Sequence, residues 1–306
     1  MNDKIQEQNR PDAKRFEFGQ NWTRFVKKNF KQERCDIAME KILKFSGRED
    51  MKGLEVIDVG CGSGLHSLGM FQAGAQKIHS LDYDKNSVNA TKILHDYAKS
   101  PSNWTIEQGD ALDKPYLESL GKWDFVYSWG VLHHTGSMWE AIKNVADMAK
   151  PDGYFYIALY SSDADFQPSK EFWLEIKQKY VHGSWIKKKY MVLWYVWRFA
   201  MQKDIRRLGE VINRVVSYRF NRGMNYFADI RDWLGGWPME YAGDQETTDL
   251  MEQEFGYKLI NVDTGQACSE FLFQRTGTPA EKTIVVDMIA DKKAKLEAED
   301  TAKETA

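Results

Sequence analysis

Three alternate glycines that follow a short apolar run near residue 60 carry the most chemical information in the sequence. The run 56–59 (VIDV) is typical of a buried strand; Gly60, Gly62 and Gly64 come after it, and a helical stretch begins at Leu65. Glycine adopts positive φ angles and lets a ligand approach the main chain without meeting a Cβ. The start of the next helix offers free N–H groups. The pattern therefore predicts a turn that holds a polar or anionic ligand.

The spacing of these glycines separates two kinds of cofactor. The dinucleotide fingerprint is G-x-G-x-x-G, whereas here the third glycine comes one residue earlier and Leu65 stands where the longer motif has glycine. Asp58, two residues before the first glycine, has no function in a dinucleotide site. It can anchor the turn and, through water, an ammonium group, which S-adenosylmethionine has and a dinucleotide lacks. The motif favours S-adenosylmethionine, and a nicotinamide-dependent oxidoreductase is kept as the alternative.

Further acidic and aromatic residues follow the next apolar runs. Asp82 ends the second run, and an acid about 20 residues beyond the glycine turn is placed to accept hydrogen bonds from both ribose hydroxyls. Tyr83 can lie against an adenine, and Asp110 can accept a hydrogen bond from the adenine amino group. Trp129, at the end of the fourth run, is expected near the reacting sulfur. Taken alone, Asp82 could merely cap a helix and Asp110 could belong to a turn.

The elements that position these residues can be read from the same region. Five apolar runs between 54 and 160 alternate with helix-compatible stretches, which predicts an α/β fold with a doubly wound, mostly parallel, Rossmann-like sheet. Two later runs, 256–264 and 269–276, predict an antiparallel hairpin that completes seven strands. We expect five parts: an N-terminal helical segment (1–50), the cofactor-binding core (51–160), a helical lid over the acceptor (161–245), the final hairpin (246–278) and a charged, flexible tail (279–306).

Five motifs in this region, VIDVGCGSG, LDYD, EQGDA, WDFVYSWGVLHHT and KPDGYFYI, resemble those of class I S-adenosylmethionine-dependent methyltransferases. The resemblance covers residues 54–160 approximately, and it is greatest to the branch of quinone-biosynthesis C-methylases and small-molecule methylases. The predicted hairpin resembles the last two strands of the family. It implies an enzyme that takes a methyl group from S-adenosylmethionine. Two neighbouring residues, Cys61 and Ala111, are also predicted to contact the cofactor. Cys61 is interpreted mainly as a small residue that fits the turn. The cofactor contacts implied by the family are Asp58, Gly60, Gly62, Asp82, Tyr83, Asp110 and Trp129.

The segment 161–245 lies where this family varies and covers the acceptor. It is typical of helices at about 169–181, 185–201 and 203–220, followed by an aromatic loop at 229–242 (DIRDWLGGWPMEYA). This loop resembles one in uncharacterised bacterial methylases, some of which are linked to cell-surface sugar modification. Two interpretations are open: the loop forms a wall of the acceptor pocket, or it is a turn that packs the lid on the sheet. The two histidines after the fourth strand also suit a structural function. The expected acceptor contacts are His133, Trp233, Trp237, Tyr241 and Arg222, and the candidate bases are His134, Asp232 and Glu240.

The lid is strongly basic within 183–223, which has ten Lys or Arg against two acidic residues, together with eight aromatic residues. Three interpretations compete. In the first, the basic residues are solvated while the aromatic residues pack on the core. In the second, the basic residues bind an anionic acceptor. In the third, this stretch contacts an anionic membrane surface.

Composition limits the remaining choices. The chain has 306 residues and a formal net charge of −3, which argues against general nucleic-acid binding. Three scattered cysteines predict neither a disulfide framework nor a zinc site, and we expect no metal. The N-terminus lacks the apolar segment of a secretory signal, and the longest apolar run, 191–201, is too short to span a membrane. We therefore expect a cytoplasmic protein, whose oligomeric state the sequence leaves open.

Methyl transfer from a sulfonium is an in-line displacement in which positioning alone can lower the barrier by roughly 7–11 kcal/mol. No strong base is therefore obligatory. The sequence does not identify the acceptor, which we expect to be small or medium-sized, with anionic and lipid- or sugar-linked molecules as options. It also does not choose among oxygen, nitrogen and carbon, and a cofactor-binding protein without turnover stays open.

Overall fold

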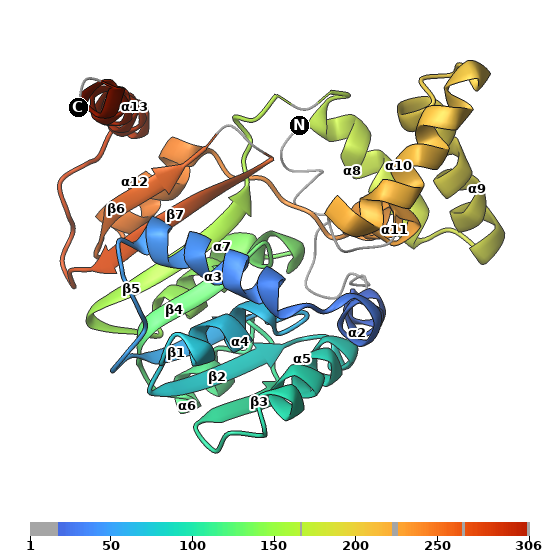
Figure 1. Cartoon of the computed structure of the whole chain (residues 1–306). Helices are drawn as coiled ribbons and strands as arrows, with labels where there is room; N and C mark the ends of the chain where they lie inside the picture. Colours follow the sequence, from blue (N-terminus) through green and yellow to red (C-terminus); the bar gives the residue numbers. More distant parts are fainter. Residues whose placement is uncertain (1–17, 166, 222–225, 265–266, 305–306) are drawn as a thin grey trace.

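A seven-stranded sheet forms the centre of the structure (Figure 1). The structure, a computed structural model, describes residues 18–165, 167–221, 226–264 and 267–304. The strand order is β3-β2-β1-β4-β5-β7-β6. The strands are β1 (Glu55–Val59), β2 (Lys77–Asp82), β3 (Trp104–Gln108), β4 (Trp123–Trp129), β5 (Ala149–Tyr160), β6 (Tyr257–Asp263) and β7 (Cys268–Arg275).

Strands β1 to β6 all run in one direction, and β7, which lies between β5 and β6, runs in the opposite direction. β1 pairs with β2 and β4, and the parallel ladder continues to β3 and β5. β7 pairs antiparallel with both β5 and β6. The predicted fold class, a mostly parallel doubly wound sheet with a final antiparallel hairpin, is confirmed. The carboxyl ends of β1 to β5 therefore meet at one edge, where ligands bind in such sheets.

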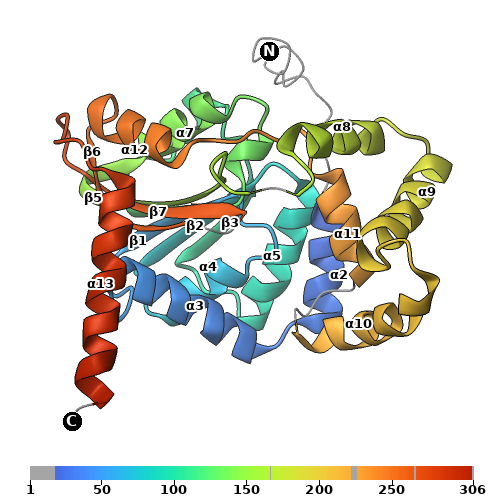
Figure 2. The ribbon, with the colours of Figure 1, turned by 90° about the horizontal axis from the view of Figure 1, so that it is seen from above.

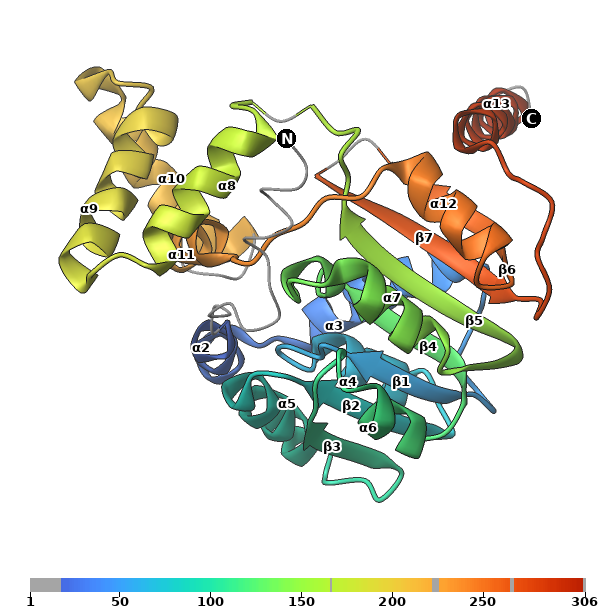
Figure 3. The same cartoon turned by 180° about the vertical axis from the view of Figure 1, so that it is seen from behind.

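Helices cover both faces of the sheet (Figures 2 and 3). The strands must then be apolar on both sides, as β1 shows: Ile57 belongs to one core cluster and Val56 to the other. One face carries α3 (Gln32–Ser46), α4 (Leu65–Gln72) and α5 (Lys85–Tyr97), and the other carries α6 (Lys114–Ser119), α7 (Met138–Ala146) and α12 (Asp244–Gln253).

In the described part of the chain, from residue 18 onward, two helices precede the first strand. Apolar residues at helical spacing, Ile37, Met39, Ile42, Leu43 and Phe45, predict a helix that ends near Gly47. This helix is α3. It ends at Gly47, whose φ of +64° is favourable for glycine and whose N–H donates to the carbonyls of Leu43 and Lys44. The other helix, α2 (Gly19–Asn29), lies within the N-terminal segment 1–50 that was expected to be helical, and it packs against α5.

After β5 the chain leaves the sheet and forms a separate layer of helices, which we call the helical lid. In Figures 1 to 3 it lies at the end of the molecule opposite the C-terminal helix. The lid has its own apolar core, in which Trp173, Met191 and Leu234 are buried. Its elements are α8 (Lys170–Val181), α9 (Trp185–Tyr195), a π-helical turn (Val196–Ala200), a 3-10 turn (Ile205–Arg207), α10 (Leu208–Asn221) and α11 (Tyr226–Gly235).

The aromatic loop predicted at 229–242 is partly helical, which corrects that prediction. Tyr226, Ile230 and Leu234 recur every four residues and are buried in the lid core, so α11 continues to Gly235. Only the part from Gly236 onward is a loop. It returns to the sheet, where the N–H of Ala242 donates to the carbonyl of Tyr160 at the end of β5 (3.0 Å).

Two helices flank the final hairpin where the sequence suggested only strands and a tail. Residues 246–278 begin within α12, and the expected charged tail contains α13 (Val285–Glu304). The buried carboxylate of Glu252 in α12 accepts hydrogen bonds from the N–H groups of Leu259 (3.1 Å) and Thr283 (2.7 Å). Because Val285 is also buried, the start of α13 is attached to the core.

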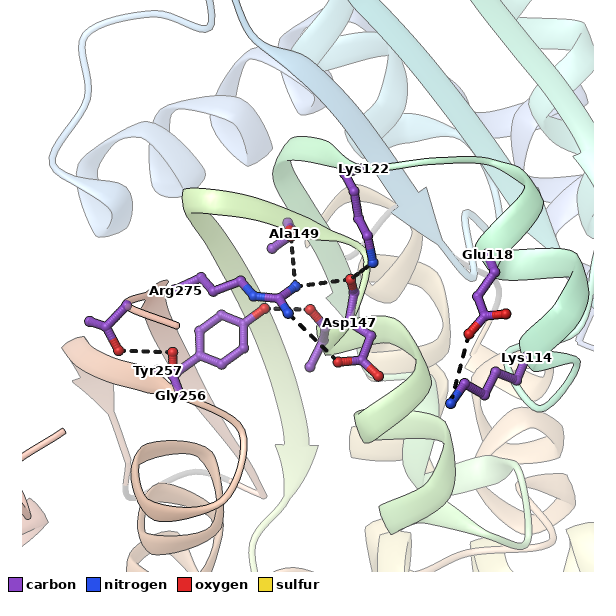
Figure 4. A network of polar contacts seen from close by, with 10 residues as sticks. Lys114, Glu118, Lys122, Asp147, Ala149, Gly256, Tyr257 and Arg275 are labelled. Carbon is purple, nitrogen blue, oxygen red and sulfur yellow. Dashed lines mark hydrogen bonds and ion pairs between the residues drawn. The ribbon is translucent and has the colours of Figure 1, made fainter. Parts of the chain in front are cut away.

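The hairpin is fixed to the turn between α7 and β5 by a polar network (Figure 4). The guanidinium of Arg275 donates to the carbonyls of Asp147 (3.0 Å) and Ala149 (2.7 Å), and the hydroxyl of Tyr257 donates to the carbonyl of Ala146. The ammonium of Lys122 also donates to Asp147. A cation near the end of α7 satisfies carbonyls that the helix leaves free, so the hairpin is held at the edge opposite the strands' carboxyl ends.

Candidate functional site

The turn between β1 and α4 can only be made with glycine. Gly60, Gly62 and Gly64 have φ angles of +84°, +54° and +77°. A Cβ on Gly60 would lie 2.4 Å from the side chain of Val131, and one on Gly64 would lie 2.8 Å from Thr91. Both the backbone conformation and the packing therefore require the predicted residue type.

Asp58 lies buried beneath this turn, in a chain of buried hydrogen bonds. The hydroxyl of Ser67 donates to Asp58 Oδ2 (2.5 Å), the hydroxyl of Ser80 donates to Ser67 (2.9 Å), and the indole N–H of Trp104 donates to Ser80 (2.9 Å). Burial raises the pKa of Asp58 to about 7; the bond from Ser67 opposes this rise, and the charge of Asp82 adds to it. The chain keeps the carboxyl group in a fixed position under the glycine turn.

Asp82, at the end of β2, is tied to the same turn. The N–H of Gly62 donates to Asp82 Oδ2 (2.9 Å), and the N–H of Asp84 donates to Oδ1 (2.8 Å). Burial raises the pKa of Asp82 to about 6, and these two backbone bonds oppose the rise. The side chain of Ser87 is a third hydrogen-bond partner of this carboxylate. Since two carboxylate oxygens accept about four hydrogen bonds, Asp82 keeps capacity for one more, from a ligand hydroxyl.

Aromatic side chains stand open at the same edge. Tyr83 after β2 is 53% exposed and Trp129 at the end of β4 is 41% exposed, both high for residues of this size. A Cβ on Gly130 would meet no atom within 4 Å. Asp110, after β3, is partly buried and accepts from the N–H of Leu112 (3.0 Å). An open edge with aromatic faces and carboxylates suits a nucleoside, so the residues present fit the expected cofactor.

Cys61 and Ala111 have a different character. The thiol of Cys61 accepts a hydrogen bond from the hydroxyl of Thr91 in α5 (3.2 Å), and burial raises its pKa well above the usual range. Ala111 is buried, and its carbonyl accepts from the amide of Asn144 (3.2 Å). These contacts agree with the interpretation of Cys61 as a small residue that fits the turn.

Helix α2 covers the glycine turn, which the sequence did not predict. The indole nitrogen of Trp22 would lie 3.4 Å from a Cβ on Gly62. The helix is fixed to the start of α5, since the N–H of Gly19 donates to Asp84 (2.6 Å) and the hydroxyl of Thr23 donates to the carbonyl of Asn86 (3.0 Å). The sequence does hold a signal for the helix, since Phe18, Trp22, Phe25 and Val26 recur at helical spacing, but this repeat does not indicate which turn the helix covers.

His133 and His134 form the turn after β4 and differ in their surroundings. His133 is fully buried; its Nδ1 accepts a weak bond from the N–H of Tyr160 (3.4 Å), and its Nε2 has no partner. His134 Nδ1 lies 2.8 Å from the carbonyl of Pro238 and must donate to it, so the neutral ring has its lone pair on Nε2. Burial lowers the pKa of His134 to about 4, which keeps the ring neutral near pH 7.

Glu240 connects the returning loop to the start of α7. Its Oε2 accepts from the N–H of Met138 (3.0 Å), and its own N–H donates to the carbonyl of His133 (2.9 Å). Burial raises its pKa to about 7, which the hydrogen bonds from Met138 and Gly136 oppose. A carboxylate at a helix N-terminus is stabilising, so Glu240 has a structural contact that competes with its predicted function as a base.

The residues predicted to contact the acceptor from the lid differ in where they lie. Trp233 and Tyr241 lie around Tyr160 at the end of β5, with ring centroids 6.2 and 6.0 Å from it. Trp237 is buried, with 3% of its surface exposed. Arg222 lies outside the described residues.

Asp232 on α11 reaches back toward the cofactor edge. The side-chain amide of Asn21, next to Trp22 in α2, donates to Asp232 Oδ1 (2.5 Å). Burial raises the pKa of Asp232 to about 7, and the bond from Asn21 opposes the rise. This bond joins α11 of the lid to α2, the helix that lies over the glycine turn. Asp232 is therefore close to the predicted cofactor site.

Lys177 was missed by the sequence prediction. It lies on α8 with 1% of its surface exposed, donates to the carbonyl of Trp233, and has its Nζ 4.0 Å from the centroid of the Trp233 ring. Burial lowers its pKa to about 7. A Cβ on Gly236 would lie 3.1 Å from His134 and 3.4 Å from Lys177 Nζ, so the ammonium is close to that histidine. One lysine among the many of the lid could not be singled out without the fold.

The chemistry of these groups is that of proton transfer and hydrogen bonding. Neutral His134, Asp232 with its raised pKa and Lys177 with its lowered pKa all change protonation at accessible pH values. In the part of the chain that the structure describes, no three His, Cys, Asp or Glu side chains are grouped to hold a metal ion.

Comparison with known proteins identifies the family. Residues 50–210 match the family described as "Methyltransferase domain", which is more than half of the chain. The chain belongs to this methyltransferase family, and the resemblance to class I S-adenosylmethionine-dependent methyltransferases is confirmed.

Individual relatives share only part of their length with this chain. A tRNA U34 carboxymethyltransferase of Idiomarina loihiensis is 28% identical over 121 residues, 38% of this chain and 36% of the relative. A mitochondrial ubiquinone biosynthesis O-methyltransferase of Dictyostelium discoideum is 32% identical over 136 residues, 41% of each chain. The chain thus spans well under half the length of these curated relatives. A solved structure of magnesium protoporphyrin IX methyltransferase from Synechocystis is 16% identical, with a TM-score of 0.46 over 80% of this chain and 83% of the other.

Proposed function

We propose that this protein is an S-adenosylmethionine-dependent methyltransferase that acts on a small or medium-sized acceptor bound beneath the helical lid. The observation that carries the proposal is the pair of carboxyl groups, Asp58 under the glycine turn and Asp82 hydrogen-bonded to it, at the open edge of a sheet in a chain of this family. When bound, S-adenosylmethionine supplies a methyl group made electrophilic by its sulfonium.

Each residue of the cofactor site has a distinct task in this proposal. Asp82 accepts the ribose hydroxyls, Asp110 accepts the adenine amino group, and the exposed ring of Tyr83 lies against the base. The peptide groups of Gly60 and Gly62 allow close approach, and Asp58 acts on the ammonium group through water. Cys61, Ala111 and Trp129 border the same site.

The lid supplies the acceptor side. We propose that residues 161–245 function as a unit that closes over the carboxyl ends of β4 and β5, with Trp233 and Tyr241 as apolar walls and Trp237 supporting them. His133 and Arg222 stay predicted acceptor contacts. Orientation of the acceptor in a partly dry site provides most of the catalysis.

Three groups are candidates to take up a proton from the acceptor. His134 is neutral, with its lone pair on Nε2, and Asp232 lies beside the cover of the glycine turn. Both are better placed than Glu240, whose carboxylate already binds the start of α7. We therefore assign the proton to His134 or Asp232 if the acceptor atom is an oxygen.

The buried ammonium of Lys177 favours an acceptor with an anionic group. Lys177 contacts the Trp233 carbonyl and ring, but no acidic group contributes to its pKa. Burial of a cation without an anion beside it is unfavourable, and an anionic ligand would relieve that cost. Relatives are named for tRNA U34 and for ubiquinone intermediates, which are different acceptors. That no nucleic acid binds stays a prediction, as does contact of the basic stretch 183–223 with a membrane.

Isothermal titration calorimetry tests the cofactor site. S-adenosylmethionine and S-adenosylhomocysteine should bind, and NAD should not. Asp82→Asn should weaken binding by about 10- to 100-fold, because hydrogen bonds to a charged group contribute about 1.5–3 kcal/mol, while the unfolding temperature changes little. Asp113→Asn, at the exposed N-cap of α6, is the matched control and should bind normally. Unchanged affinity in Asp82→Asn, or preferential binding of NAD, would overturn the assignment.

Turnover is tested separately by transfer of labelled methyl into fractionated metabolite and lipid extracts. The expected result is a labelled product together with release of S-adenosylhomocysteine. Tight cofactor binding without any labelled product would instead support a binding protein without turnover.

A further inference from the structure

Helix α9 and its π-helical continuation are apolar on two sides. On the inner side, residues such as Met191 pack in the lid core. A surface helix normally has polar residues on its other side. Here the outer side has apolar residues at intervals of three or four: Ile186, Tyr190, Leu193 and Trp197, which are 64%, 66%, 66% and 42% exposed.

A second exposed apolar stripe follows in the next helix of the lid. On the inner side of α10, Val211 is buried in the lid core. The outer residues, from the 3-10 turn into α10, are Ile205, Leu208, Ile212 and Val216, with 64%, 47%, 54% and 62% exposed. We call the two stripes together, residues 186–197 and 205–216, the outer face of the lid. The inner sides are packed, so this exposure does not come from a loosely folded lid.

The outer face is also basic. Residues 186–216, which span both stripes, have eight Lys or Arg and two acidic residues. Each of these acids is paired locally, Asp204 with Arg206 (2.8 Å) and Glu210 with Arg207 (2.8 Å). Lys187, Lys189 and Arg198 are exposed beside the first stripe. The positive charge is thus concentrated here although the whole chain has a net charge of −3.

Only some partners match both properties. RNA would satisfy the basic residues and stack on tyrosine or tryptophan, but it would leave the aliphatic Ile186, Leu193 and Ile212 in water. A second copy of the chain would cover the aliphatic residues but would bring two strongly basic surfaces together. A bilayer with anionic headgroups accepts aliphatic and aromatic side chains at its interface and attracts Lys and Arg.

We propose that the outer face of the lid docks on the surface of a membrane that contains anionic phospholipids. The helices lie in the plane of the interface. α9 and the π-helical turn together comprise 16 residues, and a span needs about 20. Among the described residues, no helix has both the length and the apolar character for crossing a bilayer. The proposal is independent of methyl transfer, since it concerns a surface on the outside of the lid.

Vesicle co-sedimentation tests the docking directly. The full chain should bind vesicles of phosphatidylcholine with about 30% phosphatidylglycerol at least about tenfold more tightly than phosphatidylcholine alone, and binding should weaken as salt rises from about 50 to about 500 mM. Lys187→Gln/Lys189→Gln should lose about 25-fold, at about fivefold for each basic residue near the surface.

The apolar contribution needs its own variants and a matched control. Ile186→Ser/Leu193→Ser and Ile212→Ser/Val216→Ser should each weaken binding to anionic vesicles at least about tenfold. Ile37→Ser/Val286→Ser removes apolar residues that are 49% and 73% exposed on α3 and α13, outside the lid, and should bind as the parent does. Calorimetry with S-adenosylmethionine should give the same affinity for every variant, which separates this proposal from the cofactor site.

Three results would overturn the proposal. One is equal binding to neutral and anionic vesicles, or no binding to either. Another is a dimer in sedimentation equilibrium that the Ile186→Ser/Leu193→Ser variant abolishes, because a second copy would then occupy the face. The last is binding of a mixed-sequence RNA that weakens in the same aliphatic variants.

Discussion

At the scale of single residues, the carboxyl groups of the site have pKa values that bring their ionisation close to neutral pH. Asp58, Asp82, Asp232 and Glu240 all have raised pKa values, and burial is the first cause for each. Folded protein therefore holds protons that unfolded protein has released. Perturbed carboxyl groups that cluster at one edge are typical of functional sites.

Asp58 makes this linkage measurable. Its pKa is about 7 in the folded protein and about 3.9 in an unfolded chain. Because the folded state binds the extra proton, the free energy of unfolding should fall as pH rises from about 4 to about 7. Asp58→Asn keeps an oxygen for Ser67 and cannot ionise, so the fall should become smaller, by roughly 4 kcal/mol at most. Urea unfolding at a series of pH values measures the difference; parallel curves for parent and variant would contradict it.

At the scale of elements, the glycine turn and the turn that follows β4 depend on each other. Gly60 has a positive φ and lies against Val131, so Gly60→Ala combines backbone strain with a steric clash. We expect a loss of about 2–4 kcal/mol in the free energy of unfolding.

Adding Val131→Ala is the control for the steric part. The double variant should regain the part of the free energy of unfolding that was lost to the clash. It should not regain the roughly 1–2 kcal/mol that alanine costs in a left-handed backbone conformation. Chemical denaturation of the four proteins of this cycle gives the coupling, and purely additive effects would show that the two residues do not interact.

Helix α2 is the second element with a specific consequence. Trp22→Ala should uncover the glycine turn, so the amides of Gly60 to Gly64 should exchange with deuterium faster and the cofactor should bind less tightly. Trp185→Ala, at a residue 66% exposed on α9, is the matched control. If the turn exchanged at the parent rate in Trp22→Ala, α2 would not act as its cover.

At the scale of the whole molecule, the lid and the sheet have separate apolar cores. Trp173→Ala should damage the lid, because truncation of a buried tryptophan costs about 3–5 kcal/mol, while the cofactor site depends on the sheet. We expect cofactor affinity within about twofold of the parent and a much lower rate of methyl transfer. Calorimetry and a methyl-release assay on the same preparation check this, and an equal loss of both would mean that the cores are not independent.

Much of this architecture follows from local patterns. The glycine turn, the five parallel strands, the final hairpin and the end of α3 at Gly47 could be predicted, because backbone conformation and alternation of apolar runs are local properties. The continuation of α11 through Ile230 and Leu234 was missed because the paired glycines after it resembled a loop. Helix α12 was also missed, since its polar sequence has only a weak apolar repeat.

The sequence by itself determined the family and the fold class, since both depend on residue types at short spacing. Only the tertiary structure decided that Trp22 covers Gly62, that Asn21 joins Asp232 across 211 residues of chain, and that Lys177 is buried beside His134. It also decided which apolar residues of the lid face outward. Burial and partner choice depend on which elements pack together, and contacts between distant segments leave no pattern in a single sequence.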